Sequence, residues 1–186
     1  GYQALYSNTT GYYNSAMGVN ALYYNTSATS TTAIGYESAK GTAAYSNQGG
    51  VYLGYQAGYS AAANSNYNTM LGYQAGYGVT TGANNILLGY KAGYSGTNLV
   101  TGSNNIIIGY NIGATSTSMT NGLNIGNLIF ATGLDGSGTT LSTGNVGIGT
   151  TSPAAKLDVV SDVILREGLQ VGYTATASYS RFGSAN

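Results

Sequence analysis

One seven-residue phrase returns three times in the middle of the chain and restricts the possible folds more than any other feature. It occupies residues 53–59, 71–77 and 88–94, and each copy reads Leu-Gly-Tyr-x-Ala-Gly-Tyr. Like units at a regular period bury a continuous core only by stacking on their neighbours. We therefore expect an elongated repeat protein built from coils of about 18 residues.

The same frame, aligned on its first glycine, extends over most of the chain. The aligned glycines are Gly1, Gly18, Gly35, Gly54, Gly72, Gly89, Gly109 and Gly126. The residue before the glycine is always large and aliphatic, and the residue two positions earlier is mostly β-branched, which favours a strand. We predict the first of these positions to be the core column: Met17, Ile34, Leu53, Leu71, Leu88, Ile108, Ile125 and, in a last modified rung, Ile148. The predicted fold is all-β, a parallel β-solenoid (β-roll) with two short strands and two turns per coil.

A second apolar column stands two residues before the glycine. It consists of Ala16, Ala33, Tyr52, Met70, Leu87 and Ile107. Strand alternation directs it to the face opposite the predicted core. Another copy of the same chain is the simplest cover for such a face. We therefore expect this column to be an interface in a homo-oligomer, with three chains as the preferred number.

Tyrosines form two further columns, one residue and five residues after the glycine. The first is Tyr2, Tyr36, Tyr55, Tyr73, Tyr90 and Tyr110, and the second is Tyr6, Tyr23, Tyr59, Tyr77 and Tyr94. If each repeat is one coil, like residues lie about 4.8 Å apart and the tyrosines form ladders. From Gly1 to Gly109, the residue two after the glycine is polar and is expected to meet water or to form an amide ladder.

Composition changes towards the C-terminus, where seven of the ten charged residues follow Gly133. Residues 1–132 are predicted as the solenoid repeat domain, 133–152 as a junction or last modified rung, and 153–186 as a small, incomplete β module. Short strands are expected over 156–160, 163–165 and 169–173.

The residue inventory argues against most chemistry. The chain has no Cys and no His, which removes thiol nucleophiles, catalytic triads and most zinc sites. Glu37 and Asp135 lie far apart in a stacked body, and Asp158 and Asp162 are better explained by solvation. The segment from Asp135 to Gly138 is better explained as a turn than as a calcium site. We predict no catalytic, cofactor or metal site.

Charge and hydropathy limit the partners. Five basic and five acidic residues give zero net charge, which provides no basic patch for nucleic acid. No stretch approaches the length of an apolar membrane span, so no membrane insertion is expected from this segment.

The phrases at 85–89 and 104–109 resemble a known family. Asn85-Ile86-Leu87-Leu88-Gly89 and Asn104-Asn105-Ile106-Ile107-Ile108-Gly109 are similar to the head repeats of trimeric autotransporter adhesins of the YadA type. The resemblance covers about residues 1–130 and implies a trimeric left-handed β-roll displayed outside a bacterial cell. This chain differs from the family in its longer coils, its often bulky residue two before the glycine and its tyrosine after the glycine. Residues 144–159 are similar to a phrase common at junctions in phage tail fibres and bacterial surface proteins.

These observations predict a structural fibre segment, extracellular on a cell surface or a virion, that serves adhesion by many weak contacts with an unknown surface protein or glycan. Three alternatives remain open: a receptor-binding phage tail fibre, a self-assembling filament subunit and, with least support, a carbohydrate-active enzyme.

Overall fold

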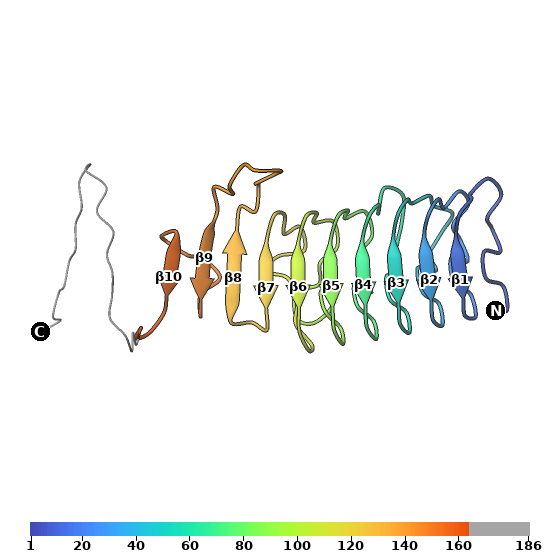
Figure 1. The fold of residues 1–186 in the computed structure, drawn as a ribbon. Coiled ribbons are helices and arrows are strands. Elements are labelled where there is room, and N and C mark those ends of the chain that lie inside the picture. The colour runs from blue at the N-terminus through green and yellow to red at the C-terminus, as the bar shows by residue number, and fades with distance from the viewer. Residues whose placement is uncertain (164–186) are drawn as a thin grey trace, which may run out of the picture.

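The computed structural model describes residues 1–163, which form strands and turns without any helix. Ten short strands join into one sheet in chain order, and Figure 1 shows them standing side by side with the connecting arcs above and below. The strands are β1 (Ser15–Met17), β2 (Thr32–Ile34), β3 (Val51–Leu53), β4 (Thr69–Leu71), β5 (Ile86–Leu88), β6 (Ile106–Ile108), β7 (Leu123–Ile125), β8 (Ile129–Thr132), β9 (Asn145–Ile148) and β10 (Leu157–Val159). The predicted all-β solenoid is confirmed.

Strands β1 to β7 run parallel and in register, one strand per coil. Tyr52 pairs with Met70, for example, and Leu87 pairs with Ile107. The predicted second strand of each coil is replaced by a turn, because residues two and four after the glycine adopt positive φ, as in Gln56 (51°) and Gly58 (62°). Backbone hydrogen bonds still connect the coils along this turn.

The repeating glycine is required where the strand enters the turn. Gly72 has a φ of 135°, and a Cβ added there would lie 2.4 Å from the carbonyl oxygen of Gly89 in the next coil. Neither atom can move away, since both belong to the stacked backbone. Only glycine therefore allows the coils to approach at this corner.

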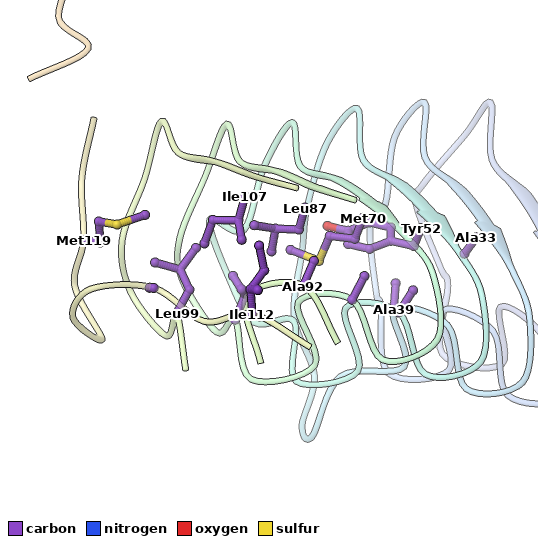
Figure 2. Close-up of a cluster of buried hydrophobic side chains, with 14 of the residues drawn as sticks. Ala33, Ala39, Tyr52, Met70, Leu87, Ala92, Leu99, Ile107, Ile112 and Met119 are labelled. Atoms are coloured by element: carbon purple, nitrogen blue, oxygen red, sulfur yellow. The ribbon is translucent and has the colours of Figure 1, made fainter. Parts of the chain in front are cut away.

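The prediction of which face forms the core is wrong. The middle residue of each strand points into the coil, and Ala33, Tyr52, Met70, Leu87 and Ile107 are fully buried within one chain, while Ala16 is partly buried. Figure 2 shows Ala33, Tyr52, Met70, Leu87 and Ile107 inside the coils, opposite Ala39, Ala92 and Ile112. The predicted interface column is therefore the core.

Because side chains alternate along a strand, the predicted core column points outward. Met17, Leu53, Leu71, Leu88 and Ile125 are exposed, and Ile34, Ile108 and Ile148 are half-buried. The coil interior is narrow, so it holds one strand side chain opposite a small residue such as Ala57, Ala75 or Ala92.

Two glycines leave room in the interior for Tyr52, the aromatic residue of this column. A Cβ on Gly50 or Gly58 would lie 2.3–2.4 Å from the ring of Tyr52. The Tyr52 hydroxyl accepts a hydrogen bond from Asn47 Nδ2 (3.0 Å) and donates one to the carbonyl of Ser65 (3.2 Å). The buried phenol is thus both accommodated and hydrogen-bonded.

A ladder of buried asparagines lies directly before strands β4 to β6 and connects each coil to the next by hydrogen bonds. Oδ1 of Asn68 accepts hydrogen bonds from the backbone N–H (2.9 Å) and Nδ2 (3.1 Å) of Asn85. Oδ1 of Asn85 accepts the same pair from Asn105, both at 3.0 Å. Nδ2 of Asn85 also donates to the carbonyl of Gly102 (2.9 Å). Each side-chain amide therefore satisfies a backbone N–H and a backbone carbonyl of the next coil.

The parallel stacking ends after β7. Strand β8 folds back antiparallel to β7, β9 is antiparallel to β8, and β10 is parallel to β9. Strand β10 lies within the predicted strand at 156–160, whereas the strand expected at 169–173 and most of that at 163–165 lie outside the described residues. The division at 132 and 152 stays a prediction, although β9 and β10 continue the same sheet.

Candidate binding face

The outward side of strands β1 to β7 forms a continuous, mainly aliphatic face. Register pairing aligns its residues in two rows along the rod. One row is Ser15, Thr32, Val51, Thr69, Ile86, Ile106 and Leu123, and the other is Met17, Ile34, Leu53, Leu71, Leu88, Ile108 and Ile125. Leu88 retains 39% of its exposure and Met17 62%. We call these two rows the aliphatic face.

The sequence contained a signal for this face that our prediction did not use. The outward position before the glycine holds a large aliphatic residue of similar size in every coil. The inward column, in contrast, changes from Ala33 to Tyr52, and Gly50 and Gly58 accompany the larger side chain. Compensation between a large side chain and nearby glycines is typical of an enclosed space. Uniform size in a column is equally compatible with a regular outer surface.

The first predicted tyrosine ladder is present from the third coil onward. Successive rings of Tyr36, Tyr55, Tyr73, Tyr90 and Tyr110 stack with centroids 5.0–5.3 Å apart and planes within 16°. We call these five residues the outer ladder. Tyr2 does not extend it, because the intervening coil has Val19 at this position. Partial burial, followed by the neighbouring phenols, raises the pKa of Tyr55.

The second tyrosine column forms two separate stacks. Tyr6 stacks on Tyr23 at 5.0 Å, and Tyr59, Tyr77 and Tyr94 follow one another at 4.6–4.7 Å. Lys40 occupies the position between the two stacks, and its Nζ lies 5.3 Å from the Tyr59 ring centroid. The predicted tyrosine ladders are therefore confirmed except at Tyr2, and the second ladder is interrupted at Lys40.

The polar column beside the ladders contains an ion pair joined to an amide chain. Lys40 Nζ donates to Glu37 Oε1 (2.7 Å), Gln56 Nε2 donates to Glu37 Oε2 (2.8 Å), and Gln74 Nε2 donates to Gln56 Oε1 (2.9 Å). Burial raises the pKa of Glu37, but the hydrogen bonds from Lys40 and Gln56 outweigh it, and the pKa lies below its usual value. Hydrogen bonding to Glu37 likewise raises the pKa of Lys40. This arrangement holds an acidic side chain as an ion within the stack.

The structure does not bring the candidate carboxylates together. Glu37 follows β2, whereas Asp135 follows β8 at the other end of the coils. Asp135 accepts hydrogen bonds from the backbone (2.6 Å) and hydroxyl of Thr143, which closes a turn, and these bonds lower its pKa. Asp158 accepts from the backbone of Ala154. Within residues 1–163, no group of three His, Cys, Asp or Glu side chains could hold a metal ion.

Two adjoining pockets lie where the coils meet β8. Their volumes are about 250 and 400 Å³, and both are lined by Thr115, Phe130 and Thr151. The other lining residues include three Ser and three Thr: Ser95, Ser116, Ser118, Thr97, Thr120 and Thr132. The pockets offer hydroxyl groups beside a single aromatic ring, and they contain no ionisable side chain.

Comparison with known protein families, with curated proteins and with solved structures finds no match to this chain. In the part of the chain that the structure describes, no helix is long and apolar enough to cross a membrane.

Proposed function

We propose that this chain is a segment of an extracellular structural fibre, on a cell surface or a virion, in which copies of the solenoid associate side by side and serve adhesion. The observation that carries the proposal is the aliphatic face, which runs along all seven parallel coils. A regular rod with one apolar side is suited to lateral assembly. The proposed role is mechanical and adhesive rather than catalytic.

The size of the exposed apolar surface supports self-association. With side-chain areas of roughly 100 Å² for an aliphatic residue and 200 Å² for a tyrosine, the exposed fractions give on the order of 900 Å² for the aliphatic face and outer ladder together. Monomeric proteins rarely expose contiguous apolar patches above about 600 Å². A stable interface buries about 800 Å² per partner. A second copy with the same coil spacing matches this face row by row.

A homotrimer is the preferred assembly, because the resemblance of residues 1–130 to YadA-type heads implies three chains. In a trimer, the aliphatic faces meet around a central axis, and the turns and long arcs remain outside for contact with a surface protein or glycan. Many identical contacts along three rods would give adhesion by avidity.

Attachment of the purified chain to arrays of glycans and matrix proteins tests the adhesive role. We expect retention that survives a roughly tenfold increase in salt, because the chain has few charges. Leu88→Glu places a charge on the aliphatic face and should reduce retention by dissociating the assembly, whereas Gln74→Glu, in the polar column, should not. Failure to attach to any surface, or loss of attachment in moderate salt, would contradict the adhesive role.

A further inference from the structure

The outer ladder places the reactive edges of five phenols in one row. Because the rings are stacked nearly parallel at 5.0–5.3 Å, both faces of Tyr55, Tyr73 and Tyr90 are covered, whereas Tyr36 and Tyr110 are covered on one face. The surface that remains exposed on the three inner rings is therefore the ring edge and the hydroxyl. This geometry is unsuitable for a sugar that stacks on an open aromatic face. It does leave the carbon atoms ortho to the hydroxyl accessible.

The composition makes tyrosine the main electron donor of this chain. The sequence has 19 Tyr but no Trp and no Cys, so the two usual competitors for a one-electron oxidant are absent. Of the three methionines, Met70 and Met119 are buried and Met17 is exposed. An oxidising equivalent that reaches the rod is therefore expected to reside on tyrosine.

We propose that the outer ladder is a site of oxidative modification, at which tyrosines of successive coils become joined by dityrosine bonds. The oxidant is of the peroxidase class and consumes hydrogen peroxide. Each of two phenols loses one electron and one proton to become a phenoxyl radical. The two radicals form a carbon–carbon bond between their ortho positions, and the ortho hydrogens move to the oxygens to restore both aromatic rings. Hydrogen peroxide takes up the two electrons and two protons and becomes two water molecules.

Proximity is the reason why coupling follows the ladder. Tyr55 and Tyr73 are held with their centroids 5.0 Å apart, so two radicals need only a rotation of exposed side chains to react. Such preorganisation replaces a bimolecular encounter with an intramolecular step. Tyr13 is the most exposed tyrosine of the described residues at 84%, yet it contacts its neighbour Tyr12 edge-on. Exposure alone would favour Tyr13, and closeness alone would favour the half-buried pair Tyr59 and Tyr77 at 4.7 Å, whereas the outer ladder combines stacking with exposure.

The modification would strengthen a fibre that has no disulfides. A bond between Tyr55 and Tyr73 closes a covalent loop across one coil, and a short covalent loop restricts the unfolded chain in the way that a disulfide does. The bond would resist separation of adjacent coils under load. This inference rests on the ladder and not on the adhesive role. Because side-by-side association would cover the outer ladder, we expect the coupling on the single chain, and the test uses chains dissociated by dilution or by Leu71→Glu.

Oxidation of the full chain provides the test. Peroxidase with hydrogen peroxide and, separately, illuminated ruthenium tris-bipyridyl with persulfate would be applied, and dityrosine would be measured by its fluorescence and by peptide mass mapping. Each bond should remove two hydrogen atoms from the mass. We expect links between ladder neighbours of one chain, such as Tyr55 with Tyr73, and a higher thermal unfolding temperature after coupling.

Two matched variants make the test specific. Tyr73→Phe keeps a stacked ring but removes the phenol, so it should abolish two of the four links of the outer ladder. Tyr67→Phe removes an exposed phenol outside the ladder and should change none of them. Circular dichroism would confirm that both variants fold. The proposal is overturned if both variants lose dityrosine equally, if links run mainly through Tyr13 or between identical positions of different chains, or if the folded chain forms no dityrosine.

Discussion

Two adjacent leucines provide the sharpest test of the orientation of the strands. Leu87 is fully buried in the coil, whereas Leu88 points outward with 39% exposure. Replacement of each by alanine removes the same atoms from neighbouring positions of β5. The two variants therefore differ only in the face from which the atoms are lost.

The expected costs differ several-fold. A Cβ on Gly76 or Gly93 would lie within 3.0 Å of Leu87 Cδ1, so the Leu87 side chain fills its space closely. Inter-coil hydrogen bonds prevent the backbone from collapsing into a cavity, and Leu87→Ala should lower the free energy of unfolding by about 3–4 kcal/mol. Leu88→Ala removes a side chain that is about 60% buried and should cost the single chain about 1 kcal/mol.

Urea unfolding, followed by far-ultraviolet circular dichroism at several chain concentrations, would separate the two effects. Leu87→Ala should lower the midpoint equally at every concentration. Leu88→Ala should mainly change the concentration dependence of the midpoint, because association stabilises the folded chain by mass action. An equal or greater loss for Leu88→Ala in dissociated chains would refute the assignment of the two faces.

Three further perturbations test the stacking itself. Gly72→Ala should cost at least about 4 kcal/mol in urea unfolding, because its Cβ would meet the backbone of the next coil, whereas Gly96→Ala, with positive φ but open space, should cost only about 1–2 kcal/mol. Asn85→Ala leaves buried polar groups unpaired and should cost about 2–3 kcal/mol, while Asn84→Ala, at an exposed neighbour with a φ of 57°, should cost only about 1 kcal/mol; equal losses would contradict the buried ladder. Burial raises the pKa of Tyr52, so its contribution to stability is complete below about pH 10 and is lost as the pH rises further. Thermal melts should therefore show alkaline destabilisation that is smaller in Tyr52→Phe, and an unchanged pH profile would contradict this origin.

The repeat determined much of the fold because each coil must bond to the next at the same positions. Recurrence of the phrase at 53–59 and 71–77 was enough to predict a parallel solenoid and stacked tyrosines. The inward and outward faces could not be assigned from alternation alone, since Leu87 and Leu88 are both apolar. The deciding quantity is the width of the interior, which depends on turns whose positive φ values were not predicted.

The antiparallel return of β8 was also beyond the repeat pattern. Asn124 takes the inward strand position in β7, and its Nδ2 donates to the Gly113 carbonyl and to Oδ1 of Asn127, both at 2.9 Å. This polar residue ends the apolar column, and Phe130 from β8 pairs with it. A change from an aliphatic residue to asparagine was the available signal that the stacking would alter here.

The mass of the purified chain in solution, measured by light scattering during gel filtration over a range of concentrations, tests the central claim that the aliphatic face joins copies of this rod. We predict a constant mass of three chains, and a folded single chain for Leu71→Glu, which places a charge in the centre of that face. A wild-type chain that remains a folded monomer at every concentration would contradict the claim.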